Sequence, residues 1–171
     1  MLKITDANFD VFNHNWALVT AGTPDDFNTM TVSWGSLGCI WSPGKNGGAK
    51  QIVTVYIKPV RYTHSFLEKN EFFTVSFFPE KYKDDLKILG SRSGRDCDKL
   101  ALTKLTAKPM ADGKAVGFNE SCSAIVCRKI YTQAMDINSI PADIVSNYYE
   151  TEAPHTMFIG EVMSIENTDG E

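Results

Sequence analysis

A mainly β fold with a few attached helices, arranged as a barrel or a sandwich, is the architecture that this sequence predicts. Six segments are rich in β-branched and aromatic residues and are bounded by turn formers, as strands are. The helical patterns between them are too short for β-α-β units throughout, so the sheet is expected to be predominantly antiparallel. The residue pattern does not rank a barrel above a sandwich. The predicted strands are Trp16–Ala21, Asn28–Trp34, Ile52–Ile57, Phe72–Phe78, Ser121–Thr132 and Met157–Ile165.

Two helices are expected from the spacing of apolar residues. The first follows Pro59 and ends near Asn70. The second begins at Pro79, and Gly90 is expected to end it. Each presents one apolar face, formed by Tyr62, Phe66 and Leu67 in the first helix and by Tyr82, Leu86 and Leu89 in the second.

A third helix and two loops complete the expected elements. Ser93 is a suitable N-cap with Asp96 three positions later, so a helix is expected there. The stretches Ser42–Gly48 and Lys108–Gly113 are expected to be loops because they are rich in turn formers. The inward face of the third helix would consist of Cys97, Leu100 and Ala101.

Length and charge restrict the class of protein. A chain of 171 residues suits one domain, here residues 1–171, which can fold without disulfides or a metal. Its 17 basic and 21 acidic residues give a net charge of −4, which argues against nucleic acid as the main partner. No apolar stretch approaches the roughly 20 residues of a membrane span, and the N-terminus lacks a signal-peptide pattern. We therefore expect a cytoplasmic protein with neither a membrane nor a nucleic-acid partner.

The four cysteines are expected to be free thiols. They form no CxxC pair and no zinc-type spacing with a histidine, so no metal site is predicted. Cys122 and Cys127 are five residues apart in one predicted strand and therefore point to opposite faces. Cys97 lies between two aspartates, which disfavours its thiolate. A role stays open for Cys39, which follows a strand suspected of binding a ligand.

The predicted strand Asn28–Trp34 is the first segment that carries chemical information. Its two-residue alternation places larger apolar side chains on one face and three hydroxyl residues, Thr29, Thr31 and Ser33, on the other. Such a row lets a ligand approach the backbone closely and offers rotatable donors and acceptors. A half-exposed strand with a solvated polar face is the alternative, because threonine favours strands in any case.

Two further segments are suited to binding an anion. Around Arg61 and Thr63 a strand enters a helix, whose first N–H groups can cradle a phosphate together with the guanidinium and the hydroxyl. A surface arginine in the first helical turn is the alternative. In the loop Gly90–Asp96, two glycines permit a tight backbone and two arginines supply positive charge. A loop that only joins two helices is the alternative there.

The segment Pro154–Val162 places His155 at the start of a strand, where the imidazole can hydrogen-bond a ligand or titrate near neutral pH. A polar surface histidine is the alternative. The chain has no GxGxxG after a strand, no P-loop, no GxSxG and no HExxH motif. Rossmann-type binding of a dinucleotide is therefore not supported, and any nicotinamide cofactor would bind transiently.

Together, five segments spread over nearly the whole chain resemble the flavin reductase-like family, the FMN-binding split-barrel proteins that include flavoredoxin. Each segment is weak alone, whereas their order and spacing are specific. The resemblance implies a six-stranded split barrel, usually a homodimer, with noncovalent FMN near the subunit interface. The five segments are Asn28–Gly35, Val55–Thr63, Phe72–Phe78, Gly90–Asp96 and His155–Val162.

The resemblance also implies which positions would hold FMN. The strand Asn28–Trp34 would lie along the flavin, and the helix start at Arg61 would lie near its phosphate. The loop Ser91–Ser93 would meet either the phosphate or the pyrimidine edge, while His155 and Phe158 would approach the ring. No catalytic nucleophile is implied. The implied cofactor-binding set is Asn28, Thr29, Met30, Thr31, Ser33, Trp34, Tyr56, Arg61, Thr63, Ser91, Arg92, Ser93, His155 and Phe158.

Two functions follow from the resemblance. One is an oxidoreductase that passes hydride or electrons from NAD(P)H through FMN to an acceptor, with a positive group such as Arg92 stabilising the reduced ring. The other is a flavoredoxin-like electron carrier that a partner protein reduces. A barrel with another small ligand or none is a third reading, which the hydroxyl strand and the arginine loop disfavour. The long loop Ser42–Lys50 departs from the family pattern, and it would alter the phosphate end or the nicotinamide entrance.

Overall fold

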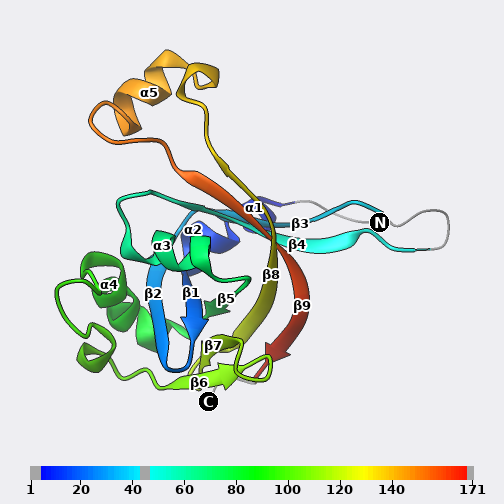
Figure 1. The fold of residues 1–171 in the computed structure, drawn as a ribbon, viewed down its shortest axis with the longest axis vertical. Coiled ribbons are helices and arrows are strands. Elements are labelled where there is room, and N and C mark those ends of the chain that lie inside the picture. Colours follow the sequence, from blue (N-terminus) through cyan, green and yellow to red (C-terminus); the bar gives the residue numbers. More distant parts are fainter. Residues whose placement is uncertain (1–4, 43–46, 169–171) are drawn as a thin grey trace.

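The computed structural model describes residues 5–42 and 47–168, and its fold is mainly β, as predicted (Figure 1). The strands are β1 (Ala17–Thr23), β2 (Asp26–Val32), β3 (Gly35–Ile40), β4 (Lys50–Ile57), β5 (Phe72–Phe77), β6 (Ala107–Met110), β7 (Ala115–Phe118), β8 (Ser123–Ala134) and β9 (Thr156–Asn167). The α-helices are α1 (Asp6–Phe9), α2 (Val11–Asn15), α3 (Tyr62–Lys69), α4 (Lys83–Ser91) and α5 (Ala142–Tyr148). Short 3-10 turns are η1 (Glu80–Tyr82), η2 (Leu100–Leu102) and η3 (Ile137–Ser139).

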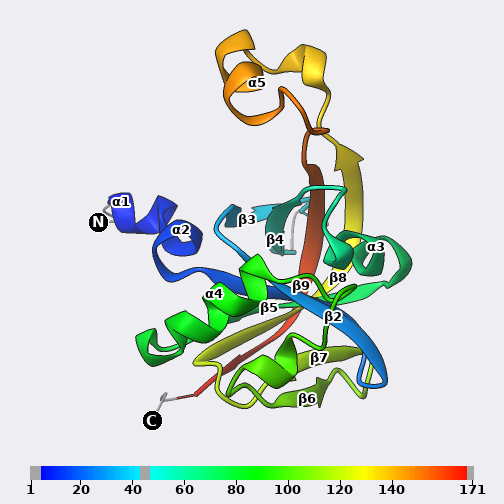
Figure 2. The ribbon, with the colours of Figure 1, turned by 90° about the vertical axis from the view of Figure 1, so that its left-hand side faces the viewer.

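A seven-stranded antiparallel sheet forms a barrel, with one strand more than the resemblance implies. The strand order is β2-β1-β5-β8-β9-β4-β3, so β2 and β3 are the two edges of the sheet. Only Ser33 and Trp34 separate these two strands in the chain, and the sheet must therefore curl until its edges meet there. The long strands β8 and β9 assist the curl through register shifts at Val126/Cys127 and Lys129/Tyr131. Figure 2 shows the resulting strong bend of β8 and β9.

Apolar side chains from alternate strand positions fill the barrel. Val19, Val55, Phe73 and Phe158 are almost completely buried in one cluster. Gly160 allows β9 to pass close to this cluster, because a Cβ there would lie 2.5 Å from Cζ of Phe73. This core keeps the strands that surround the site in fixed positions.

The first two predicted helices are present, with one difference at the end of the second. α3 buries Phe66 and Leu67, and Asn70 caps its end as expected. The second helical segment starts as η1 and continues as α4, which runs through Gly90 to Ser91. The prediction that Gly90 ends the helix is therefore wrong. Its small size serves packing instead, since a Cβ there would lie 3.1 Å from Cβ of Thr31 on β2.

The third predicted helix is absent. Ser93 closes a turn rather than capping a helix, because its Oγ accepts the Arg95 N–H at 3.2 Å. Only the short turn η2 follows, and Cys97 and Ala101 are exposed rather than inward-facing. Lys99 holds the intervening segment, since its Nζ donates to the Leu89 carbonyl at 3.0 Å.

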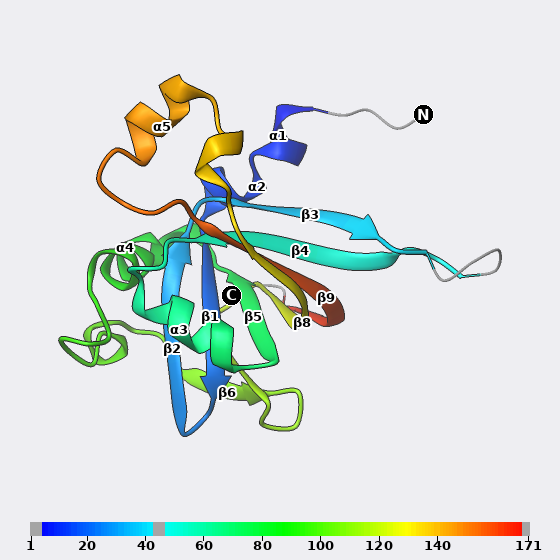
Figure 3. The same cartoon turned by 45° about the horizontal axis from the view of Figure 1, so that its top comes forward.

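Three strands were not predicted. β3 is an edge strand with two glycines, and it extends with β4 beyond the rest of the sheet (Figure 3). The predicted loop Lys108–Gly113 is wrong in part, because Lys108 to Met110 belong to β6, which pairs with β7. Glycine and proline inside these strands hide the usual strand pattern. Of the other predicted loop, Ser42, Gly47 and Gly48 lie outside regular structure, and residues 43–46 lie outside the described part.

The extended ends of β8 and β9 carry an arm, residues 135–155, that contains η3 and α5 (Figures 1 and 2). Lys58 at the end of β4 ties this arm to the barrel through an ion pair with Glu152 and a 3.5 Å hydrogen bond to the Tyr148 carbonyl. The arm therefore reaches back over the end of β4. None of the helices in residues 5–42 and 47–168 has the length and apolar character that crossing a bilayer requires.

All four cysteines are free thiols, as predicted. Cys39 and Cys97 are exposed, whereas Cys127 is buried in the barrel core. Burial raises the pKa of the Cys127 thiol to about 12. This thiol is therefore protonated at every physiological pH.

Candidate functional site

A cavity of about 580 Å³ opens where the end of β2, the start of α3, the end of α4 and the arm converge. Its volume falls within the roughly 300–1,000 Å³ of small-molecule sites. Four stretches of chain that are distant in sequence supply its walls. The lining residues are 28, 30–34, 56, 58, 60–63, 89–94, 99, 148, 152 and 155.

The hydroxyl residues of β2 use most of their hydrogen-bonding capacity inside the protein. Thr29 is buried, and its Oγ1 lies 2.7 Å from Oγ1 of Thr20 on the neighbouring strand. Thr31 lines the cavity, but its hydroxyl donates to the Leu86 carbonyl of α4. Ser33 lines the cavity at the point where the two sheet edges meet. The prediction of a continuous hydroxyl row facing a ligand is therefore wrong at Thr29.

The start of α3 faces the cavity with Arg61 and Thr63. No side chain caps this helix. The His64 N–H donates to the Arg61 carbonyl at 3.0 Å, and the N–H groups of Tyr62 and Thr63 stay available for a ligand. Asn28 fixes the helix start, because its Nδ2 donates to Oγ1 of Thr63 at 2.6 Å. Asn28 is 6% exposed, and this bond joins β2 to α3 inside the wall of the cavity.

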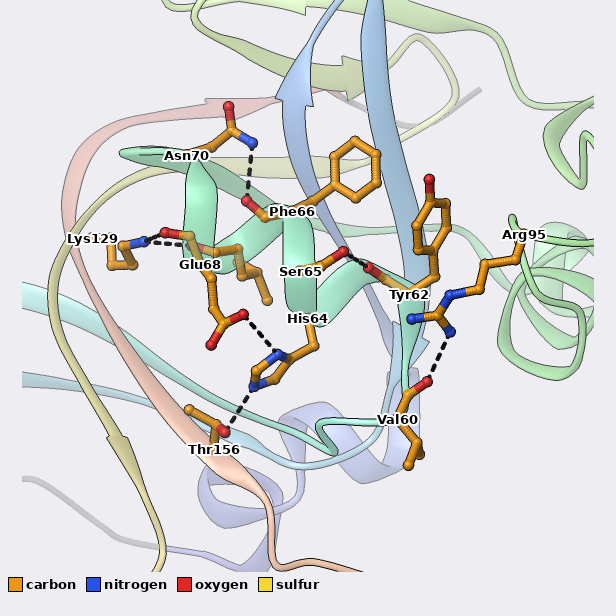
Figure 4. A network of polar contacts seen from close by, with 11 residues as sticks. Val60, Tyr62, His64, Ser65, Phe66, Glu68, Asn70, Arg95, Lys129 and Thr156 are labelled. Carbon is orange, nitrogen blue, oxygen red and sulfur yellow. Dashed lines mark hydrogen bonds and ion pairs between the residues drawn. The ribbon is translucent and has the colours of Figure 1, made fainter.

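Deeper contacts hold the rest of α3 in place (Figure 4). Nε2 of His64 lies 2.8 Å from Oγ1 of Thr156 on β9, and Nδ1 lies 3.5 Å from the Glu68 carboxylate. Burial lowers the pKa of His64, and the negative charge of Glu68 opposes this shift in part. Lys129 of β8 donates to the carbonyls of Leu67 and Glu68 at the end of the helix. The helix start is therefore presented on a rigid support.

The arginine loop, residues 91–95, packs against the start of α3. The Arg95 guanidinium donates to the Val60 carbonyl at 3.0 Å and lies 4.8 Å from the Tyr62 ring centre, as Figure 4 shows. Gly94 allows the close approach, since a Cβ there would lie 2.2 Å from Oδ1 of Asn28. The two segments predicted to bind an anion therefore lie side by side.

The charge of the lining is strongly positive. Lys58, Arg61, Arg92 and Lys99 line the cavity, while Glu152 is the one acidic residue in this lining. Lys99 is buried among them, and burial together with the charge of Arg61 lowers its pKa to about 8. Such a surface attracts an anionic ligand.

Aromatic side chains form another part of the wall. The Trp34 ring lies 4.7 Å from the His155 ring and 5.7 Å from the Tyr148 ring, measured between centres. The Tyr149 hydroxyl lies 3.0 Å from Nδ1 of His155. Burial, assisted by the charges of Lys58 and Arg61, lowers the pKa of His155 to about 4. The imidazole is therefore neutral at pH 7, and the wall can hold a flat ring without charge repulsion.

The cavity brings together all but two of the residues predicted to bind a cofactor. Thr29 does not line it, and its hydroxyl lies beside that of Thr20; Phe158 is completely buried in the barrel core, 5.4 Å from the His64 ring. The other predicted residues line the cavity: Asn28, Met30, Thr31, Ser33, Trp34, Tyr56, Arg61, Thr63, Ser91, Arg92, Ser93 and His155.

Several lining residues were not found from the sequence. Lys58 stands directly before the Pro59–Thr63 segment, so the same strand-to-helix signal could have included it. Lys99 was not among the inward-facing residues of the third predicted helix, which does not form. Tyr148 and Glu152 belong to the arm, which has no pattern that links it to the cavity.

Comparison with known proteins identifies the fold. The chain is similar to the flavoredoxin of Methanosarcina acetivorans, with 18% identity, a TM-score of 0.69, and coverage of 99% of this chain and 76% of that one. It is also similar to the flavoredoxin of Desulfovibrio vulgaris (Miyazaki F), with 23% identity, a TM-score of 0.67, and coverage of 99% and 78%. The styrene monooxygenase flavin reductase of Pseudomonas putida S12 has 19% identity and a TM-score of 0.62, with coverage of 91% and 80%.

These likenesses establish the split-barrel fold, which the resemblance predicted. No curated protein matches the chain significantly. The family described as flavin reductase like domain matches residues 9–171. The chain therefore belongs to the flavin reductase-like family.

Proposed function

We propose that the cavity binds FMN noncovalently and that the protein passes hydride or electrons from NAD(P)H through it to an acceptor. One observation carries the proposal: an uncapped helix start and a cluster of cations share a single cavity with a neutral aromatic wall. A phosphorylated aromatic ligand needs both features, because its phosphate requires positive charge and N–H donors, whereas its ring requires an uncharged aromatic surface. The family and the flavin proteins of similar fold agree with this ligand.

The phosphate would lie at the start of α3. There the free N–H groups of the first turn, the Arg61 guanidinium and the Thr63 hydroxyl converge on the cavity. Gly94 and Asn28 hold the arginine loop against this turn. Arg92, which lines the same cavity, would meet either the phosphate or the polar edge of the ring.

The ring would lie toward Trp34, Tyr148 and His155. Bound FMN would supply the site that accepts and donates hydride or single electrons. The protein would orient the ring through stacking and would exclude water with the arm, which Lys58 and Glu152 hold over the cavity. Neutral His155 would offer a hydrogen bond without adding a charge.

An electron carrier without its own nicotinamide activity is the second candidate. The two flavoredoxins of similar fold favour it, whereas the styrene monooxygenase flavin reductase favours the enzyme. A carrier would receive its electrons from a partner protein. Both candidates require FMN in the same cavity.

Visible absorbance and a nicotinamide assay test these proposals in order. We expect the purified protein to be yellow or to bind added FMN, with tryptophan quenching from Trp34. A protein that remains colourless with added FMN would contradict both candidates. Oxidation of NADH or NADPH in the presence of FMN would identify the enzyme, and a flavin-loaded protein that oxidises neither would identify the carrier.

We also propose that a second copy of the chain covers β3, giving a homodimer. Among residues 5–42 and 47–168 this strand pairs with β4 alone, which leaves its other edge unpaired, and Leu37 within it and Trp41 just after it are 52% and 55% exposed. Light scattering should give twice the chain mass for the wild type and the chain mass for a Leu37→Ser/Trp41→Ser variant. A monomeric wild type would refute the proposal.

A further inference from the structure

His155 has two ring nitrogens, and the structure gives a partner to one of them. Nδ1 lies 3.0 Å from the Tyr149 hydroxyl, whereas Nε2 forms no hydrogen bond within residues 5–42 and 47–168 and remains accessible. His155 lines the cavity, and Tyr149 stands behind it, outside the lining. Nε2 is therefore the nitrogen left for a ligand in the cavity.

Aromatic contacts fix the plane of the imidazole but not its direction. The His155 ring centre lies 4.7 Å from that of Trp34, with 35° between the ring planes, and 5.7 Å from that of Tyr149, with 75° between the planes. A half-turn about the Cβ–Cγ bond would keep both ring contacts and move each nitrogen to the opposite side. The hydrogen bond between Nδ1 and the Tyr149 hydroxyl therefore distinguishes the two orientations.

The hydroxyl of Tyr149 is the donor of this hydrogen bond. Tyr149 is 6% exposed, and in the described part of the chain its hydroxyl has no other hydrogen-bond partner. If it accepted a bond from Nδ1–H, its own O–H would be left without an acceptor, which is destabilising. Because burial lowers the pKa of His155 to about 4, the ring is neutral at pH 7 and carries one proton. With Nδ1 as acceptor, that proton lies on Nε2.

Tyr149 is itself held in place by the arm and the barrel. It follows α5 directly, and its backbone N–H donates to the Val145 carbonyl at 2.8 Å. The Lys58 ammonium lies 5.9 Å from the centre of the Tyr149 ring, and the same ammonium pairs with Glu152. These contacts form within the protein, so the hydroxyl is in position before a ligand binds.

We propose that Tyr149 is a positioning residue, whose hydroxyl holds His155 with its Nε2–H turned toward the cavity, where this N–H donates to a carbonyl oxygen or ring nitrogen of the bound flavin. This inference rests on the proposed binding of FMN, and it adds a residue from outside the cavity lining. The flavin ring would lie at the aromatic wall that contains Trp34 and His155. In the other tautomer, a lone pair on Nε2 would face the acceptors of the ring and repel them.

The protonation of the imidazole can be measured directly in the flavin-free protein. Long-range ¹H–¹⁵N NMR spectra distinguish a protonated ring nitrogen from a bare one, and the chain has three histidines, His14, His64 and His155. A His155→Gln variant assigns the signals. At pH 7 we expect His155 of the wild type to be protonated at Nε2 and bare at Nδ1. Tyr149→Phe keeps the ring but removes the hydroxyl, so the tautomer ratio should shift about two- to tenfold toward Nδ1–H, as loss of one neutral hydrogen bond implies.

Affinities for two flavins test the contact with the ring. FMN and riboflavin carry the same ring and differ in the phosphate, so Tyr149→Phe should weaken both by the same factor, about two- to tenfold, as measured by flavin fluorescence. Tyr131→Phe is the matched control, since it also removes a hydroxyl, from an exposed tyrosine on β8 outside the cavity. This control should bind both flavins as the wild type does.

Each outcome decides between the proposals. A wild type protonated at Nδ1 would overturn the role of Tyr149, and the wild-type spectrum shows this even if Tyr149→Phe does not fold. An unchanged tautomer ratio in Tyr149→Phe, unchanged affinities, or a weakening of FMN alone would also overturn that role and leave FMN binding intact. If the wild type binds neither flavin, the FMN proposal fails, and the spectra of the flavin-free protein still decide whether Tyr149 controls the imidazole.

Discussion

Replacing Gly94 by alanine tests the geometry that joins the two anion-binding segments. The added Cβ would lie 2.2 Å from Oδ1 of Asn28 and 3.2 Å from Cδ1 of Tyr62. Gly94 has no positive φ, so the alanine backbone is unstrained and the collision is the whole perturbation. The Asn28 amide must move, and its 2.6 Å bond to the Thr63 hydroxyl breaks.

The magnitude follows from the loss of one buried hydrogen bond. Leaving a buried polar group without its partner costs about 1–3 kcal/mol. At roughly 2–4 °C per kcal/mol for a chain of this size, the melting temperature should fall by roughly 2–12 °C. FMN affinity should fall as well, because Asn28, Thr63 and Gly94 all line the cavity.

Urea denaturation of five proteins, the wild type, Gly94→Ala, Gly48→Ala, Asn28→Ala and the Asn28→Ala/Gly94→Ala double variant, provides the assay. Gly48→Ala is the matched control, since a Cβ at Gly48 meets nothing within 4 Å. In an Asn28→Ala background, Gly94→Ala should lower the free energy of unfolding much less, because the side chain with which the new Cβ collides is absent. The reasoning is refuted if Gly94→Ala unfolds at the same urea concentration as Gly48→Ala, or if its cost is unchanged in the Asn28→Ala background.

Three further predictions concern charge and reactivity. The pKa of His155 is lowered to about 4 in the folded protein. Between about pH 6.5 and pH 4 this histidine is therefore protonated in the unfolded chain but neutral in the folded protein, and the free energy of unfolding should fall as the pH drops from about 6.5 to 4. Denaturation at several pH values should show a shallower fall for His155→Gln than for the wild type or for a variant of the exposed His14; equal slopes would contradict this. A thiol reagent should modify exposed Cys97 in the native protein and Cys127 only after unfolding, and rapid native reaction of Cys127 would show that its burial is wrong. Arg92→Ala should weaken reduced FMN more than oxidised FMN if its charge meets the ring edge, and redox titration that shows equal weakening would assign it to the phosphate.

Strand and helix patterns predicted the parts of the fold that are locally regular. The core strands carry β-branched and aromatic residues at alternate positions, and the apolar residues of α3 recur at helical spacing. β3 and β7 were missed because Gly38 and Gly117 interrupt the pattern, and these strands form through pairing with β4 and β6. A short strand that is held by pairing with the neighbouring strand need not carry a strong strand pattern of its own.

The site was predicted where charge and backbone signals coincide in short segments. Arg61 and the loop around Arg92 are such cases, and both line the cavity. Lys99 was missed because a capping pattern at Ser93 favoured a helix, whereas tertiary contacts of Lys99 and Arg95 select a turn. Thr29 was wrongly placed although it shares a strand face with Thr31 and Ser33, because alternation does not say where along that face the cavity ends and the protein interior begins.

Because the cavity is assembled from four distant stretches of chain, no fragment of the protein can retain the ligand. The arm contacts the barrel through Lys58 and through the rings of Tyr148 and His155 beside Trp34. A bound molecule that also touches Trp34 and Tyr148 would strengthen this connection. Ligand binding would therefore stabilise the whole fold. At a free ligand concentration about a hundred times the dissociation constant, the free energy of unfolding would increase by about 2.7 kcal/mol. A molecule whose fold is disrupted would not hold the ligand, so the absorbance of the bound ligand would measure the fraction of intact molecules.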